Sequence, residues 1–293
     1  MIDYLTLKNW PFGVIDFSYD VKEVILYALG CGVGTRSLNT VDLDFLYEKN
    51  LKVLPSMAAT ICTPGFWWSN AETKVHWPSV LHAEQDVEFI KELPISGRVK
   101  GYNRVTHVHD RGQSKGAVVA LERKIVDDLG ETIAIAKRIE ILRSDGGFSQ
   151  KDGLHDPLPP RLDRHDMDRG QSYCSWNAQI DPRAHYIFRL SGDPNPLHID
   201  PEVAKTAGFE KPIFHGLGMF GLTTYLMLSN LVNGEVGKLK RLATKFSAPT
   251  YPGEHLTYWV WKIKEGFFNF SVESVDRKIM LLENGLVEFK VDS

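Results

Sequence analysis

The most regular hydrophobic pattern lies in the last third of the chain. Residues 213–233 contain no Asp, Glu, Lys or Arg, and apolar residues fall on all sides of a helix drawn through them. This pattern predicts a helix enclosed by protein. Four strand candidates follow it, at residues 238–246, 256–263, 267–275 and 278–291, and the run Glu283-Asn284-Gly285 predicts a turn that breaks the last one. One uncharged helix followed by antiparallel strands predicts a sheet wrapped around that helix.

The first half of the chain repeats this order more weakly. Helical patterns cover residues 20–29, 41–47 and 54–62, and strand patterns cover residues 86–92, 98–109, 117–126 and 132–142. Both halves therefore place helices first and strands after, although no residue-level repeat is evident. We predict an α+β fold that arose by duplication.

A change of composition separates the two halves. The run Asp156-Pro157-Leu158-Pro159-Pro160 is followed by the densely charged stretch 161–169. Proline and charge with little apolar content are typical of a linker. We therefore predict an N-terminal domain at residues 1–150, a linker at 151–170 and a C-terminal domain at 171–293.

Composition and charge narrow the function classes. Hydrophobic residues make up 43% of the 293 residues, which is enough for a sizeable core, and the net charge of −3 argues against a nucleic-acid partner. The three cysteines are far apart and form no CxxC pair, so neither a disulfide framework nor a zinc site is expected. The ends resemble neither a secretory signal nor a peroxisomal address, and we predict a cytoplasmic protein. His215 and several glycines make residues 213–233 a better core helix than a membrane span.

The chemistry-bearing residues gather between Tyr186 and His198. Within this stretch Asp193, Asn195 and His198 are interleaved with two prolines that hold the backbone in an extended loop. A carboxylate, an amide and an imidazole fixed in this way can bind and orient one water, and Asp and His are a common acid–base pair near neutral pH. Because Asp-Pro and Asn-Pro are also ordinary turn formers, a purely structural turn remains an alternative from composition alone.

The dipeptide His215-Gly216 opens the uncharged helix. The first N–H groups of a helix have no intrahelical partner and carry the positive end of its dipole. Glycine allows a substrate to approach them closely. The position is therefore suited to stabilise an oxyanion on a thioester carbonyl.

These residues carry a family resemblance. The run Ser191 to His198, with Tyr186 before it and Ala207 after it, resembles the signature of the MaoC-type (R)-specific 2-enoyl-CoA hydratases. The resemblance extends to His215-Gly216 and Tyr251-Pro252-Gly253 in the second half. In the first half, the amino-terminal half of the two-domain, eukaryotic-type members is resembled by Leu26 to Gly30, Leu54-Pro55 and Val80 to Gln85. It covers nearly the whole chain from about Tyr19. It implies a double hot-dog fold in which each half is an antiparallel sheet around a central helix, with one active site in the second half. The first half would be non-catalytic and accommodate the acyl chain.

The resemblance also implies a reaction, the reversible hydration of trans-2-enoyl-CoA to (3R)-hydroxyacyl-CoA in fatty acid metabolism such as β-oxidation. Asp193 and His198 would activate the water and deliver its proton, Asn195 would help to position that water, and the Gly216 N–H would hold the thioester oxygen. Coenzyme A is part of the substrate, so we expect no separate cofactor and no metal. A homodimer is expected on the resemblance alone.

Three basic residues, Lys240, Arg241 and Lys245, are candidates to contact the coenzyme A phosphates. Strand edges commonly carry lysine, so a solvated edge is an equally good interpretation. Two other functions stay open: a hot-dog thioesterase, and a non-catalytic acyl-CoA binding subunit of a heteromeric hydratase. The intact pair Asp193 and His198 favours the hydratase.

Overall fold

The computed structural model describes residues 2–35, 40–164 and 167–291. Its α-helices are α1 (Tyr4–Lys8), α2 (Val21–Gly30), α3 (Thr40–Leu46), α4 (Ala184–Phe188), α5 (Pro201–Thr206) and α6 (Gly216–Val232). Its strands are β1 (Val14–Tyr19), β2 (Val80–Phe89), β3 (Gly97–Asp110), β4 (Ala117–Val126), β5 (Thr132–Leu142), β6 (Cys174–Gln179), β7 (Leu239–Phe246), β8 (His255–Lys264), β9 (Phe267–Ser274) and β10 (Ile279–Phe289).

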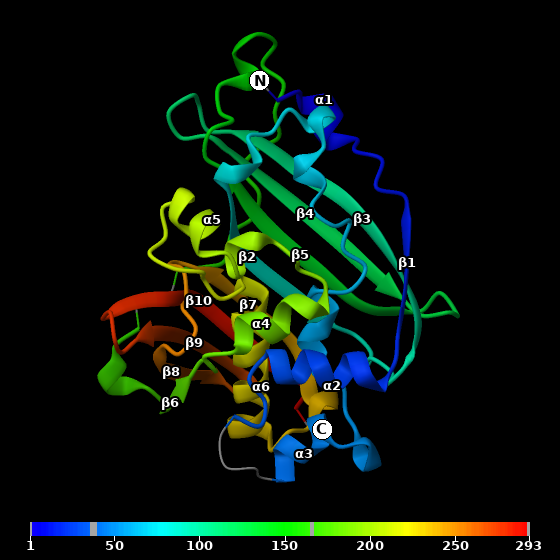
Figure 1. Ribbon diagram of the computed structural model, residues 1–293, viewed down its shortest axis with the longest axis vertical. Coiled ribbons are helices and arrows are strands. Elements are labelled where there is room, and N and C mark those ends of the chain that lie inside the picture. The colour runs from blue at the N-terminus through cyan, green and yellow to red at the C-terminus, as the bar shows by residue number, and fades with distance from the viewer. Residues whose placement is uncertain (1, 36–39, 165–166, 292–293) are drawn as a thin grey trace.

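All of these strands belong to one continuous sheet, in the order β1-β3-β4-β5-β2-β7-β10-β9-β8-β6 (Figure 1). The two halves of the chain meet where β2 pairs antiparallel with β7, from Glu84 opposite Lys245 to Glu88 opposite Arg241. Outward from this junction, the strands of each half follow in equivalent order, β2-β5-β4-β3-β1 on one side and β7-β10-β9-β8-β6 on the other. This pseudo-symmetric arrangement confirms the predicted duplication and the double hot-dog fold.

The second half forms around the predicted apolar helix. Strands β7 to β10 curve around α6, and every residue from Gly218 to Leu228 is buried (Figure 1). The largest hydrophobic core of the molecule is built on this helix and the inner faces of the sheet. None of the described helices combines the length and the apolarity that crossing a bilayer requires.

The first half has a much shorter helix at the expected place. Of the predicted helix at residues 54–62, the structure forms the 3-10 helix η2 (Pro55–Ala59), whose five residues are all buried. The guanidinium of Arg123 donates to the carbonyl oxygens of Ala58 and Ala59 at the end of this short helix. The helix η2 contacts β2, β5 and α6, so α6 supplies most of the helical packing at the centre of the molecule.

Three details differ from the sequence predictions. The edge strands β1 and β6 were not predicted, and each pairs with only one neighbour in the sheet. The last strand is not broken at residues 283–285, because β10 continues through them with a shift of register and Asn284 at φ 53°. Gly285 allows this bulge, since a side chain there would lie 2.5 Å from the ring of Phe270.

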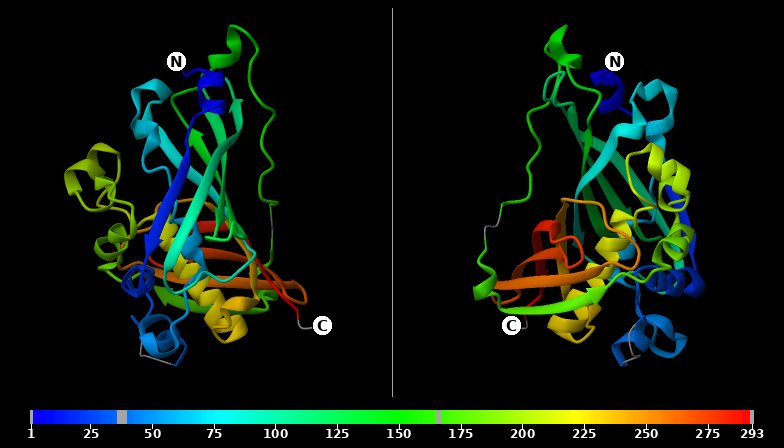
Figure 2. Two further views of the ribbon diagram at one scale, coloured as in Figure 1. Left: turned by 90° about the vertical axis from the view of Figure 1, so that its right-hand side faces the viewer. Right: turned by 60° about the vertical axis from the view of Figure 1, so that its left-hand side comes forward.

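The stretch at residues 151–164 forms no helix or strand, and Figure 2 shows it running along the outside of the molecule. It is attached to the first half by Asp156, which accepts hydrogen bonds from Lys8, Tyr4 and the backbone of Val108. These contacts hold the stretch against the first-half sheet. The domain limits at residues 150 and 171 stay predictions.

Candidate active site

The loop that carries the predicted catalytic residues is fixed by its own hydrogen bonds. After α4 and a short 3-10 turn, Gly192 takes a φ of 111°, which a residue with a side chain rarely adopts. Asn195 then caps the 3-10 turn Pro196–His198, its side-chain oxygen accepting from the N–H of Leu197 at 3.0 Å. The carboxylate of Asp193 accepts from the N–H of Asn195 at 3.3 Å. The loop therefore holds Asp193 and His198 toward each other, as predicted.

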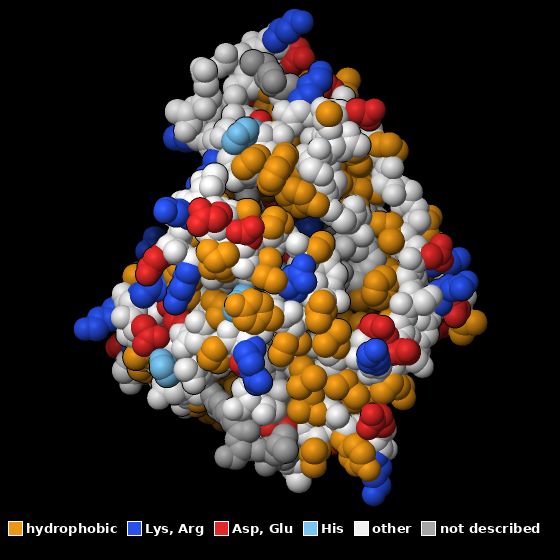
Figure 3. Space-filling model, viewed as in Figure 1, with side chains coloured by type: hydrophobic (Ala, Val, Ile, Leu, Met, Phe, Trp, Pro, Cys, Tyr) orange, Lys and Arg blue, Asp and Glu red, His pale blue; other side chains and the backbone are white. Residues whose placement is uncertain are grey.

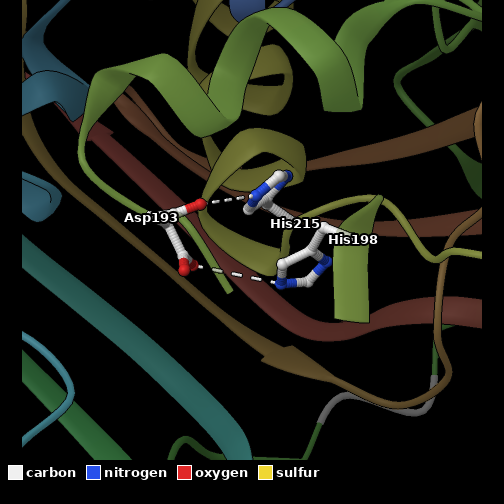
Figure 4. A group of neighbouring side chains, drawn as sticks. All are labelled: Asp193, His198 and His215. Atoms are coloured by element: carbon white, nitrogen blue, oxygen red, sulfur yellow. Dashed lines mark hydrogen bonds and ion pairs between the residues drawn. The ribbon is translucent and has the colours of Figure 1, made fainter. Parts of the chain in front are cut away.

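Figure 4 shows the cluster that results. The Nε2 atom of His198 lies 4.0 Å from the Oδ2 atom of Asp193. A second histidine, His215, stacks on the ring of His198 with 3.7 Å between the ring centroids and 28° between the planes. Its Nε2 donates to the backbone oxygen of Asp193 at 3.3 Å. The sequence pattern assigns no role to His215, although this residue directly precedes Gly216.

The hydrogen bonds of the two histidines define where their lone pairs point. The Nδ1 atom of His198 lies 2.9 Å from the carbonyl oxygen of Ile213, and only a protonated Nδ1 can donate there. The lone pair of His198 is therefore on Nε2, facing the carboxylate of Asp193. Burial lowers the pKa of His198, while the negative charge of Asp193 opposes the shift. Burial also lowers the pKa of His215 to about 2, so both rings are neutral near pH 7.

The N-terminus of α6 opens beside this cluster. The first bond of the helix runs from Met219 N–H to His215 O, so the N–H groups of residues 216–218 precede any i→i−4 bond. The side chain of His215 does not cap them. A methyl group on Gly216 would lie 3.7 Å from the ring of Phe246, an ordinary contact, whereas one on Gly218 would lie 2.4 Å from Phe214. Packing thus explains the glycine at 218 but not the one at 216, which leaves close approach of a ligand as its use.

The structure does not bring the three basic candidates to this cluster. A bulge at Lys240 places both Lys240 and Arg241 opposite Glu288. The extra residue interrupts the usual alternation of faces, so both side chains point to the outer face of the sheet. Because Phe246 contacts Gly216 on the inner face, Lys245 points to the outer face. Each of the three forms an ion pair: Lys240 with Glu288, Arg241 with Asp86, and Lys245 with Glu283. Their contact with coenzyme A phosphates stays a prediction.

Among the described residues, one group of side chains could ligate a metal ion. It consists of Asp193, His198 and His215, whose ligand atoms lie within 4.8 Å of one another. However, the protonated Nε2 of His215 points at the backbone oxygen of Asp193, which directs its lone pair elsewhere. Only the Nε2 lone pair of His198 faces the carboxylate. The arrangement therefore fits acid–base chemistry on one water better than it fits a metal site.

Comparison with known proteins supports this interpretation. Residues 169–279 match the model of the MaoC like domain, and residues 17–143 match that of the MFE-2 hydratase 2 N-terminal domain. The chain is 31% identical over 287 residues to 3-hydroxyacyl-thioester dehydratase Y of Mycobacterium tuberculosis, covering 93% of each protein. It is 34% identical over 257 residues to enoyl-CoA hydratase ChsH3 of the same organism, covering 85% of each. The crystal structure of a MaoC-like dehydratase from Phytophthora capsici superposes with a TM-score of 0.81 at 26% identity, covering 96% of each chain. The chain therefore belongs to the family of two-domain MaoC-like enoyl-CoA hydratases.

Proposed function

We propose that this protein catalyses the reversible hydration of a trans-2-enoyl-CoA to a (3R)-hydroxyacyl-CoA. The observation that carries the proposal is the His198 and Asp193 pair, separated by 4.0 Å beside the open N-terminus of α6. The names of the relatives, an enoyl-CoA hydratase and a 3-hydroxyacyl-thioester dehydratase, agree with the two directions of this reaction.

The pair can hold one water and activate it. Two acceptors 4.0 Å apart can each receive one hydrogen of the same water molecule. His198 Nε2 takes one proton as the water oxygen forms a bond to C3 of the substrate. The electron pair of the C2=C3 double bond then moves toward C1, and negative charge develops on the thioester oxygen.

The N-terminus of α6 receives this charge. In our proposal the N–H of Gly216 donates to the thioester oxygen and the helix dipole adds to the stabilisation. The proton taken from water is then returned to C2 by the same cluster, so that H and OH add to one face of the substrate. The NH₂ group of Asn195 is available to orient the water, since its side-chain oxygen is engaged by Leu197.

The environment of His198 suits a general base. Because burial lowers its pKa, the ring remains unprotonated near pH 7 and can accept the proton. The stacked ring of His215 and the bond to Ile213 hold it in one orientation. The roles of the two halves, the cytoplasmic location and the homodimer stay predictions from the sequence.

The proposal is tested by hydration of crotonyl-CoA and trans-2-decenoyl-CoA, followed by loss of the enoyl thioester absorbance and chiral analysis of the product. We expect the 3R alcohol, and a fall in turnover of about 10²–10⁴-fold for Asp193→Asn and His198→Gln. His255→Gln, in an exposed histidine on β8, is the control and should keep the wild-type rate. A folded Asp193→Asn protein with the wild-type rate would exclude the mechanism. Release of free coenzyme A thiol without the alcohol would favour the thioesterase, in which water attacks C1 instead.

A further inference from the structure

Charged residues interrupt the apolar inner face of the first-half sheet. On β5, alternate residues point inward: Ala136 packs in the large core and Leu142 in the smaller N-terminal core. Between them, the same alternation turns Arg138 and Glu140 toward the inside. Arg138 has a side-chain exposure of 19% and Glu140 one of 7%. A strand that is otherwise apolar on this face thus carries two ionisable groups.

The neighbouring strand β4 repeats the interruption. Ile125 packs in the large core and Leu121 in the N-terminal core, and the inward position between them is Arg123. Arg123 is 5% exposed. Its Nη2 atom donates to the backbone oxygens of Ala58 and Ala59, but its Nε–H has no hydrogen-bond partner among the described residues. Burial lowers the pKa of Arg123 to about 9, which leaves it charged at pH 7.

The positive charge of this cluster exceeds its negative charge. The cluster holds two arginines, Arg123 and Arg138, but one carboxylate, Glu140, which lies 3.4 Å from Arg138 and also accepts from the indole N–H of Trp68 at 2.7 Å. Burial raises the pKa of Glu140, which further weakens its negative charge. His82 is close enough for both arginines to lower its pKa, in addition to the larger effect of burial, and it is neutral. Unmatched buried charge is costly, so proteins keep it where a ligand can neutralise it.

The cluster is continuous with the active site. The ring of Phe246 lies against Gly216, and its other side meets the ring of His82 with 4.9 Å between centroids. His82 in turn lies opposite Glu140 in the sheet, near enough to Arg138 and Arg123 for their charges to lower its pKa. The first half has only the short helix η2 in this region, and Figure 3 shows a recess between hydrophobic side chains on this face in which a basic side chain is visible. The rings of Phe246 and His82 therefore lie between the proposed oxyanion position and the two guanidinium groups.

We propose that this cluster binds a carboxylate at the far end of the acyl chain, so that the preferred substrates are trans-2-enoyl-CoA esters of dicarboxylic acids. The inference rests on the proposed hydratase function. Guanidinium groups bind carboxylates in a planar, two-bonded geometry that an ammonium group cannot reproduce. The apolar chain would pass Phe246, and its terminal carboxylate would meet Arg138 and the free Nε–H of Arg123.

The test compares trans-2-enoyl-CoA esters of six, eight, ten and twelve carbons, each with and without a terminal carboxylate. We expect kcat/KM of the wild-type protein to favour the carboxylate form at one or more lengths. Arg138→Met should reduce that preference about tenfold or more, mainly through KM, because a charge-assisted hydrogen bond is lost. Arg138→Lys should restore part of it. Arg104→Met removes an exposed arginine of β3 and should leave the preference unchanged.

The outcomes separate this inference from the proposed function. Absence of the 3R alcohol from every ester would reject the hydratase and the inference with it. Hydration of the plain chains with equal or better kcat/KM than their carboxylate partners would overturn the inference alone. So would an Arg138→Met protein that lowers kcat/KM for both series equally, which would assign Arg138 a structural role.

Discussion

The packing of α6 against the end of α2 predicts a measurable clash. At Gly221 in the middle of α6, a methyl group would lie 2.2 Å from Sγ of Cys31 and 3.1 Å from the hydroxyl of Tyr27. Ordinary contacts lie at about 3.5–4.0 Å, so in Gly221→Ala the Sγ atom of Cys31 has to move by roughly 1.5 Å, through rotation of its side chain or separation of the two helices. The helix α2 cannot easily move away, because its Gly30 already abuts the backbone of Phe188.

The size of the effect follows from two opposing contributions. Overpacking a tight core costs about 1–3 kcal/mol, and the constraint on α2 places this site near the upper end. Replacing glycine by alanine inside a helix contributes about 1 kcal/mol in the other direction. We therefore expect Gly221→Ala to lower the free energy of unfolding by about 1–2 kcal/mol.

A double-mutant cycle isolates the clash. Cys31→Ala alone should cost about 1 kcal/mol, since it removes one buried heavy atom. In Gly221→Ala/Cys31→Ala the nearest remaining atoms are the hydroxyl of Tyr27 and the Cβ at position 31, 3.1 and 3.2 Å from the added methyl group, so the double variant should be more stable than Gly221→Ala. Urea unfolding followed by circular dichroism and tryptophan fluorescence measures all four proteins. A Gly221→Ala protein as stable as wild type, or a double variant no more stable than it, would refute this account of the packing.

Three further predictions follow from the site and the junction of the halves. The methyl group of Gly216→Ala meets no clash, so urea unfolding of this variant should show wild-type stability. Its kcat/KM should fall about 10²-fold, because the methyl group displaces the thioester. An unchanged rate would exclude the oxyanion role. Because burial lowers the pKa of His198, the ring stays unprotonated at pH values below about 6.5, the ordinary pKa of histidine. The acid limb of kcat/KM against pH should therefore have its midpoint below about 6.5. A midpoint above that value would contradict the burial argument. Arg241→Met breaks the two hydrogen bonds, at 2.9 and 2.7 Å, that link β7 to Asp86 of β2. Because the ion pair is partly exposed, the change should lower the free energy of unfolding by about 1 kcal/mol, and thermal denaturation should show a smaller loss at high salt. Equal losses at all salt concentrations would point to packing instead.

The elements that the sequence predicted well are those whose local pattern agrees with their environment. The helix α6 is apolar on all sides because protein surrounds it, and the alternating strands β8 and β9 cover one face of it. The residues of the edge strands β1 and β6 do alternate, but each strand is only six residues long and its inner face is mostly only partly buried, so the pattern is easily missed. The segment around Pro55 has a helical composition, but it packs against β2, β5 and α6 as a short 3-10 turn. Contacts distant in the sequence decided that outcome.

The same distinction applies to the site. Asp193 and His198 could be predicted because two prolines fix their spacing within one loop. The place of His215 depends on how α6 meets that loop, and its lowered pKa depends on burial that only the folded chain creates. The outward direction of Lys240 and Arg241 follows from a bulge, which alternation along a single strand does not reveal. The inner charges at Arg123 and Arg138 were overlooked because one charged residue in a strand is ordinarily read as its solvent face.

The pairing of β2 with β7 has a consequence for how such a protein can change. In a symmetric dimer of two identical half-sized chains, every substitution appears twice, once on each side of the interface. Here the two halves of the sheet follow the same strand order but are encoded separately, so the residues of each half can vary alone. Arg123 and Arg138 can thus lie inside the first half with no second copy imposed beside Asp193 in the other half. Because the halves are joined in one chain, substitutions in the first half can change its inner face without changing the cluster of Asp193 and His198.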